Sequence, residues 1–370
     1  MKKVLIAAGG TGGHVFPALV VADKLKQQGV EVRWVCSTRG LEKRVVQPFY
    51  KVTYLSLTGL RGNGLRGYLA LPFKMTKAIL SLFRLFVSYK PDVVLTMGSF
   101  VSGPSGVMAK MFFTPLVIHE QNARPGMTNR LLAKMADRVL QAFPGPFDGR
   151  AVFTVGNPVR ESIRRKSHHL YKAGNKTLPL RVLVLGGSQG ALALNHSIFS
   201  WWKDCAPQKC ISLWHQTGEK HLESMLQLYS SLDGERVRCD GFIDDMNAAY
   251  EWADLVICRS GALTVSEVAV AGLPAIFIPL PSAVDDHQYF NARWLVDKQA
   301  AWVLRQSECH SKALQNLLMP LIEDRQVLAT MGDCSRVCAN LTAVDDIISH
   351  LTQSCKKNNT DTQNDTQSLH

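Results

Sequence analysis

The sequence predicts an α/β protein made of two doubly wound parallel-sheet domains, because one strand–turn–helix pattern occurs twice along the chain. In each copy a buried apolar strand is followed by a glycine-rich turn and then by an apolar helical stretch. The first copy comprises Lys3–Ala8, the turn at 9–14 and Pro17–Leu25, and the second comprises Arg181–Leu185, the turn at 186–190 and Ala191–Phe199. Such a unit opens a doubly wound sheet.

Further apolar strands alternate with helical stretches in both halves, as a parallel sheet with crossover helices requires. They are Val30–Cys36, Val93–Met97 and Leu116–Ile118 in the first half, and Ser212–Gln216, Leu255–Cys258 and Ala275–Pro279 in the second. Ligands bind at the carboxyl ends of such strands. We therefore expect two lobes that face each other across a cleft.

The length of 370 residues favours two domains of ordinary size over a single core. The join is expected near Gly156-Asn157-Pro158, with an N-terminal domain at 1–158 and a C-terminal domain at 159–335. A helix at 336–354 is expected to pack back on the N-terminal domain, and the polar residues 355–370 are expected to form a disordered tail.

Composition excludes several classes of protein. The chain is 46% apolar and 19% charged, which is typical of a globular protein, and its net charge of +12 favours anionic partners. The nine cysteines form no C-x-x-C pair, so reduced thiols in a cytoplasmic protein are expected. No run of about 18 apolar residues is present to span a membrane, and the run Val4–Ala8 is too short for a signal peptide.

The glycine-rich turns place backbone N–H groups at a helix start, where they favour a phosphate. Neither turn meets the dinucleotide fingerprint G-x-G-x-x-G, which disfavours a nicotinamide dehydrogenase. His14 lies in the first turn, where it is either structural or the group that accepts the proton of an attacking hydroxyl.

Two further runs follow predicted strands. Residues 119–122 (HEQN) are either a solvated loop or part of a site. In 258–267 (CRSGALTVSE), Glu267 lies one turn into a predicted helix, where a carboxylate can accept both hydroxyls of a ribose. The alternative for that run is helix capping by Ser260 or Thr264, with Glu267 complementing the helix dipole.

These motifs together resemble the MurG family of N-acetylglucosaminyltransferases, in glycosyltransferase family 28. The match runs from about residue 1 to 350 and rests on GGTGGH (9–14), HEQN (119–122), GNPVR (156–160), GGSQGA (186–191), GFIDDM (241–246), RSGALTVSE (259–267) and HQYFNA (287–292). It implies a GT-B fold of two Rossmann-like domains. The implied reaction is inverting, metal-independent transfer of N-acetylglucosamine from UDP-N-acetylglucosamine to the 4-hydroxyl of lipid I, giving lipid II in peptidoglycan synthesis. The absence of Asp-x-Asp, a common metal handle in sugar-nucleotide enzymes, agrees with it.

The resemblance also implies roles for residues. His14 would be the base, with Glu120 as a second candidate or as the group that orients it. Ile243 would offer its backbone to uracil, Glu267 would hold the ribose, and Gln288 would contact the sugar. The other implied contacts are Asn122 to the sugar, Arg160, Ser188, Ala262, Leu263, Thr264, Val265 and Ser266 to the pyrophosphate, and Thr11, Gly12 and Gly13 closing over the sugar. No cofactor and no metal ligand are implied.

The stretch Tyr68–Tyr89 is an apolar helix with cationic residues, Lys74, Lys77 and Arg84. It is either a buried helix of the fold or, with Phe112-Phe113, part of a surface that rests on anionic lipid. The polyprenyl acceptor of the resembled family favours the second interpretation. We then expect a peripheral protein on the cytoplasmic face of the inner membrane, in contact with other cell-wall synthesis proteins.

Three alternatives remain at this stage. Another two-lobed UDP-sugar enzyme, such as a UDP-N-acetylglucosamine 2-epimerase, would share the nucleotide site but would have no use for an exposed apolar helix. A dehydrogenase is disfavoured by the turns. A non-enzymatic basic protein that binds membranes or nucleic acid is disfavoured because it leaves the three strand–turn–helix phosphate sites unexplained, and because the positive charge is not interleaved with aromatic residues in one patch.

Overall fold

The computed structural model describes residues 1–10, 12–38, 42–57, 71–165, 178–187, 190–205, 210–232 and 236–367. The chain divides into two compact units. Unit 1 is Met1–Pro158 together with Thr342–His370, and unit 2 is Val159–Leu341.

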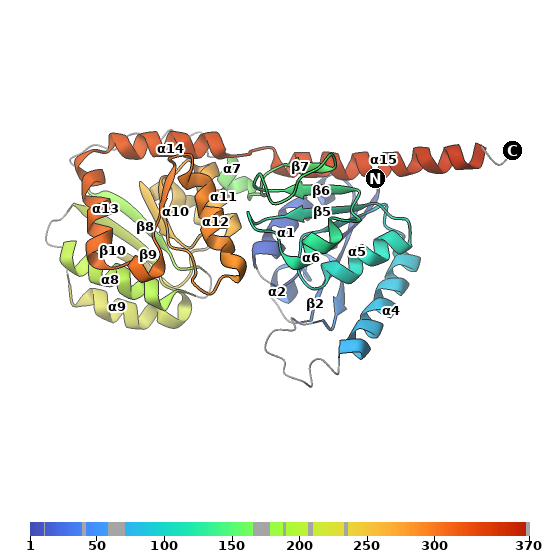
Figure 1. Ribbon diagram of the computed structural model, residues 1–370. Helices are drawn as coiled ribbons and strands as arrows, with labels where there is room; N and C mark the ends of the chain where they lie inside the picture. The colour runs from blue at the N-terminus through green and yellow to red at the C-terminus, as the bar shows by residue number, and fades with distance from the viewer. Residues whose placement is uncertain are drawn as a thin grey trace. The chain divides into compact units, whose positions relative to one another are not determined.

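Unit 1 is built around a parallel sheet with the strand order β3-β2-β1-β4-β5-β6-β7 (Figure 1). Its strands are β1 Lys3–Ala7, β2 Glu31–Ser37, β3 Lys51–Leu55, β4 Val93–Thr96, β5 Leu116–Glu120, β6 Arg138–Gln141 and β7 Val152–Thr154. Its helices are α1 Gly12–Gln27, α2 Glu42–Val45, α4 Leu71–Tyr89, α5 Ser102–Met111, α6 Met127–Leu132 and α15 Ala343–Gln367. The strand order reverses between β1 and β4, so the crevice in which this fold binds ligands lies at their carboxyl ends.

Both faces of this sheet are covered. Along β1, Val4 and Ile6 enter one hydrophobic core with α1 and α15, whereas Leu5 and Ala7 enter a second core with α4, α5 and α6. Alternation along a strand sends successive side chains to opposite faces, and here both faces are apolar, which is why the strands of the sequence read as continuous apolar runs.

The C-terminal part of the chain corrects two expectations. The helix expected at 336–354 is interrupted: α14 (Gln326–Cys338) ends in unit 2, and α15 begins at Ala343 in unit 1. The tail expected to be disordered from 355 continues α15 to Gln367, because no proline or glycine after Thr342 ends the helix. The apolar side of α15 packs into unit 1 through Val344, Ile347 and Leu351.

Unit 2 repeats the architecture with the parallel strand order β10-β9-β8-β11-β12-β13 (Figure 1). Its strands are β8 Leu180–Leu185, β9 Ile211–Gln216, β10 Val237–Asp240, β11 Leu255–Cys258, β12 Ala275–Phe277 and β13 Ala301–Val303. Its other helices are α7 Glu161–Arg165, α8 Leu192–Cys205, α9 Leu222–Ser230, α10 Met246–Trp252, α11 Ala262–Ala271, α12 His287–Val296 and α13 Ser311–Glu323, with 3-10 turns η2 Glu219–His221, η4 Val284–Asp286 and η5 Gln306–Glu308. The order reverses between β8 and β11, so the second crevice lies where the turns at 186–190 and 259–261 leave the sheet.

The predicted fold class is confirmed: both units are doubly wound parallel sheets, and the glycine-rich turn of each follows the strand at which the order reverses. In the described parts of the chain, no helix is long and apolar enough to cross a bilayer.

Candidate active site

The first glycine-rich turn of unit 1 carries His14 into the first turn of α1. Gly10 has a φ of +92°, a conformation that only glycine adopts without strain. Its N–H donates to Oε1 of Glu42, which is fully buried, at 2.8 Å. A carboxylate at this position braces the turn and disfavours a phosphate at the Gly10 N–H, because two anions there would repel each other.

Gly98, which follows β4, forms the surface against which the His14 ring rests. A Cβ at Gly98 would lie 3.2 Å from Cδ2 and Nε2 of that ring and 3.4 Å from Nδ2 of Asn129, and the φ of Gly98 is +81°. A side chain larger than hydrogen would therefore move the imidazole. The reversal point between β1 and β4 thus brings together His14, the turn after β4 and α6.

Glu120, the last residue of β5, is 2% exposed and saturated with hydrogen bonds. Its Oε1 accepts from the N–H and Nδ2 of Asn122 at 2.9 and 3.2 Å. Its Oε2 accepts from the N–H of Gly126 at 3.1 Å and from Nδ2 of Asn129 at 2.9 Å. Four donors on two oxygens leave this carboxylate holding the loop at 121–126 in one shape.

The neighbouring side chains tie the same loop to the end of unit 1. His119 donates through Nε2 to the carbonyl of Gly156 at 2.9 Å and accepts at Nδ1 from Nε2 of Gln121 at 3.0 Å. Asn157 donates to the carbonyl of Gln121 at 3.1 Å. Burial lowers the pKa of His119 to about 4, so this imidazole is neutral at pH 7. The solvated-loop interpretation of the HEQN motif is wrong, because its first three side chains are buried.

In unit 2 the central group is the carboxylate of Glu267, in α11. Its Oε1 accepts from Nη2 of Arg160 at 3.0 Å, and its Oε2 accepts from the hydroxyl of Tyr250 at 3.1 Å. The Glu267 side chain is 7% exposed and that of Arg160 is 41% exposed. Burial raises the pKa of the Glu267 carboxyl above its ordinary value, and both partners oppose that shift. The two residues expected at the ribose and the pyrophosphate are thus paired with each other.

The other residues expected to contact the donor surround α11. Ala262, Leu263, Thr264, Val265 and Ser266 form its first turns, so their backbone N–H groups lie at the positive end of the helix dipole. The N-cap is Gly261, with no side-chain cap, so the proposed capping by Ser260 or Thr264 is wrong. Ile243 is buried in the segment before α10, and Gln288, in α12, accepts from the N–H of Leu280 at 3.0 Å.

Each unit brings some of its predicted residues together. Unit 1 has Gly12, Gly13 and His14 at the start of α1, after β1, and has Glu120 and Asn122 at the end of β5. Unit 2 pairs Arg160 with Glu267 of α11, whereas Ile243 follows β10 and Gln288 follows β12. Thr11 and Ser188 lie outside the described residues.

Sequence reasoning missed four residues of these sites. Glu42, Asn129 and Tyr250 reach their partners from other elements and have no local signal. Gly98 had one, since a glycine directly follows the predicted strand Val93–Met97. Within the described chain, no group of three His, Cys, Asp or Glu residues is placed to hold a metal ion.

Comparison with known proteins identifies the family. The N-terminal domain model of glycosyltransferase family 28 matches residues 4–141, and the C-terminal domain model of that family matches residues 181–351. A Shewanella amazonensis protein is 46% identical over 347 residues, which cover 93% of this chain and 95% of that protein. Its name is UDP-N-acetylglucosamine--N-acetylmuramyl-(pentapeptide) pyrophosphoryl-undecaprenol N-acetylglucosamine transferase. The chain belongs to glycosyltransferase family 28.

Other members of family 28 agree. A Coxiella burnetii protein with the same name is 41% identical, and the match covers 96% of this chain and 99% of that protein. The crystal structure of MurG from Acinetobacter baumannii is 37% identical, covers 95% of this chain and 100% of its own, and has a TM-score of 0.80. A UDP-GlcNAc 2-epimerase from Neisseria meningitidis has a TM-score of 0.64 at 13% identity, covering 95% of this chain and 100% of its own, which shows a shared fold alone.

Proposed function

We propose that this chain transfers N-acetylglucosamine from UDP-N-acetylglucosamine to the muramyl sugar of a pentapeptide-bearing, pyrophosphoryl-undecaprenol acceptor. The observation that carries the proposal is the likeness, at 41–47% identity and over more than nine-tenths of the chain, to proteins named for this transfer. An epimerase is disfavoured, because the epimerase likeness is one of fold alone.

The proposed chemistry is a single inverting displacement that needs no metal. The 4-hydroxyl oxygen of the muramyl sugar forms a bond to the anomeric carbon as the bond from that carbon to the UDP oxygen breaks. The hydroxyl proton passes to a base, and UDP leaves with the electron pair. N–H donors at the start of α11 and the cation of Arg160 would stabilise the negative charge that develops on the leaving pyrophosphate.

His14 is the proposed base, and Glu120 the residue that positions the acceptor loop. The two oxygens of Glu120 already accept four hydrogen bonds, so a fifth proton would have to displace a loop contact. His14 lies at the reversal point of the sheet, in the half-exposed first turn of α1. Asn122, which Glu120 orients, is the proposed sugar contact from unit 1.

On the donor side, Glu267 is the proposed ribose ligand. Its oxygens are held by Arg160 and Tyr250, so a ribose would share or replace these partners. Because Arg160 is 41% exposed, its guanidinium has room to rotate towards a pyrophosphate. Ile243 and Gln288 are the proposed uracil and sugar contacts.

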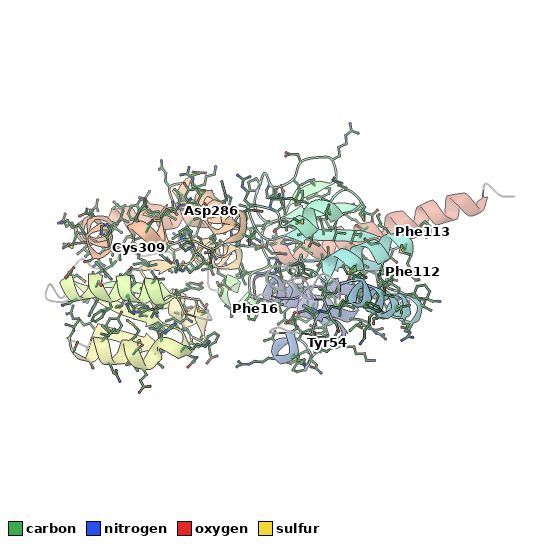
Figure 2. The ribbon with its side chains drawn as sticks, turned by 60° about the horizontal axis from the view of Figure 1, so that its bottom comes forward. Phe16, Tyr54, Phe112, Phe113, Asp286 and Cys309 are labelled. Atoms are coloured by element: carbon green, nitrogen blue, oxygen red, sulfur yellow. The ribbon has the colours of Figure 1, made fainter. Side chains whose placement is uncertain are left out.

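The proposed membrane contact is an apolar patch on α4, α5 and α6. One side of α4 packs into unit 1, and the other side exposes large apolar residues. The interpretation of this stretch as a wholly buried helix is therefore wrong. Phe112 packs inward with its ring 5.3 Å from that of Phe86, whereas Phe113 is 86% exposed (Figure 2). The exposed members of the patch are Phe73, Ile79, Leu80, Phe83, Val87, Val107, Met111, Phe113, Met127 and Leu131.

This patch supports a peripheral position on the cytoplasmic face of the inner membrane, where Lys74 and Lys77 would meet anionic headgroups. We expect the protein to co-sediment with vesicles that contain acidic lipid. Lys74→Glu with Lys77→Glu should weaken that binding, and unchanged sedimentation would contradict the membrane contact. Other cell-wall synthesis proteins are the proposed neighbours at this surface.

The test of the function is transfer of labelled N-acetylglucosamine from its UDP donor to a lipid I analogue, with EDTA present. We expect transfer to proceed in EDTA. Failure of the folded protein to transfer sugar would overturn the function, whereas transfer that EDTA abolishes would overturn only the metal-free mechanism.

A further inference from the structure

A pocket of about 560 Å³ opens beside the loop that carries Asn122. Its lining includes three cations, Arg124, Arg130 and Lys134, and three apolar residues, Pro125, Pro146 and Phe147. No carboxylate is among its lining residues. Its chemistry therefore fits an anion that also carries apolar groups.

Two walls of this pocket are held by hydrogen bonds to side chains at the ends of two neighbouring strands. Glu120 and Gln141, the last residues of β5 and β6, lie opposite each other in the sheet. Glu120 fixes the wall of Arg124 and Pro125 through the N–H groups of Asn122 and Gly126. Gln141 fixes the opposite wall, because its Oε1 accepts from the N–H of Phe147 at 2.9 Å.

The third wall is the exposed side of α6 and the turn after it. Glu120 holds this helix through Asn129, and Arg130 donates through Nε to the carbonyl of Pro125 at 2.9 Å. Arg130 and Lys134 are one helical turn apart, so their cations face the same side. Hydrogen bonds from Glu120 and Gln141 thus reach all three walls at the carboxyl edge of the sheet, where this fold binds ligands.

We propose that this pocket binds a carboxylate of the acceptor's peptide, an inference that rests on the proposed function. Arg124 is two residues from Asn122, the proposed sugar contact, so their Cα atoms are at most ~7 Å apart. The pocket is therefore within reach of a peptide attached to a sugar that Asn122 contacts. Guanidinium groups suit carboxylates, and the proline and phenylalanine surfaces suit small apolar side chains.

The experiment compares three acceptor analogues: one whose peptide has free carboxylates, one whose peptide carboxylates are amidated, and one without a peptide. The variants are Lys134→Gln, which removes an exposed cation of the pocket, and Arg130→Gln. The matched control is Lys51→Gln, an exposed cation of unit 1 on β3.

For the free-carboxylate acceptor we expect each pocket variant to lower kcat/KM about tenfold, mainly through KM. Amidation should have the same effect on the unaltered chain. Lys134→Gln should match the unaltered chain on the peptide-free acceptor, and the control should match it on all three. Arg130→Gln also removes the bond to Pro125, so Lys134→Gln decides this comparison. Equal losses on every acceptor, or no loss on the peptide-bearing one, would overturn the proposal.

Two further measurements separate this proposal from others. Binding of the free peptide alone to the full chain, followed by NMR shifts, should weaken in the variants and does not depend on any transfer. Binding to phosphatidylglycerol vesicles should be unchanged by Lys134→Gln; a loss there without a loss of peptide binding would assign the pocket to a lipid headgroup instead. If the unaltered chain transfers sugar to none of the acceptors but still binds the peptide, the proposed function is overturned and the peptide site is not.

Discussion

At the scale of single residues, the two candidate bases are separated by their surroundings. Glu120 is enclosed by four donors, whereas the His14 ring rests on a glycine at the reversal point of the sheet. We expect His14→Gln to lower kcat by about 10²–10⁴, the usual contribution of general base catalysis, and to remove the fall in rate towards acid pH.

Glu120→Gln serves as the comparison. It puts an amide N–H₂ against donors that the carboxylate now accepts from, so the loop and its Asn122 lose their fixed position. We expect a lower kcat/KM and a destabilisation of about 1–3 kcal/mol, with the acid-side fall in the pH profile retained. A profile that loses that fall in Glu120→Gln and keeps it in His14→Gln would reverse the assignment.

Gly98 gives a second prediction at this scale. Gly98→Ala adds a methyl group 3.2 Å from the His14 ring at a residue with φ of +81°. We expect about a 10²-fold loss of kcat, because a small displacement of a reacting group is enough, and about 1 kcal/mol of lost stability. The matched control is Gly103→Ala, whose nearest neighbour would be an ordinary 3.7 Å from the new Cβ and which should remain active and folded. If Gly98→Ala keeps its activity, then either His14 is not the base or the turn after β4 shifts to make room for the methyl group.

At the scale of elements, Glu267 joins three helices of unit 2. Arg160 comes just before α7, Tyr250 lies in α10 and Glu267 in α11. Arg160→Gln leaves a buried carboxylate without its cation, which we expect to destabilise unit 2 by about 1–2 kcal/mol after allowance for the exposure of the arginine. The double variant Arg160→Gln with Glu267→Gln should recover part of that loss, because no buried charge remains.

Thermal unfolding of the two single variants and the double variant measures this coupling. Donor affinity provides an independent readout. Glu267→Gln should weaken UDP binding even where stability is recovered. Additive effects on stability would mean that the interaction between Arg160 and Glu267 contributes nothing to the stability of unit 2.

The sequence predicted the elements whose signal is local and missed those that depend on distant neighbours. Apolar runs next to glycine-rich turns located β1, β8 and β11 to within a residue or two. The strands β3, β6, β7, β10 and β13 were not predicted from the sequence. Of these, β7 and β13 have only three residues each, which carry no periodicity, and all five pair with a neighbouring strand of their sheet. Glu42 was also missed, because its role depends on a contact between α2 and the distant first turn, where it accepts from the N–H of Gly10.

At the scale of the whole molecule, the chain returns to unit 1 after completing unit 2. Val344, Ile347, Ile348 and Leu351 of α15 belong to the same core as β1 and α1, so unit 1 has no complete core until the C-terminal helix is made. A helix that packs back on the N-terminal domain was expected at 336–354; the helix that does so, α15, begins at Ala343.

Each unit also holds one buried neutral histidine in a similar arrangement. His119 donates to Gly156 and accepts from Gln121, and His215 of unit 2 has Asn195 and Tyr229 on its two nitrogens. Burial lowers the pKa of His119 to about 4 and that of His215 to about 3. Protonation would bring a second N–H against the Gln121 amide, so the folded state resists it.

These pKa values predict acid instability in both units. The unfolded chain binds a proton near pH 6.5 and the folded chain does not, so stability is complete above that pH and declines as the pH falls towards 4. By pH 5 each histidine should cost about 2 kcal/mol. His119→Gln can keep both hydrogen bonds without titrating, and we expect it to flatten the dependence of the unit 1 unfolding transition between pH 7.5 and 5. His215→Gln should do the same for unit 2 alone. Calorimetric scans at the two pH values measure both transitions, and a variant that moves the midpoint equally at both would show that burial, not protonation, sets the stability.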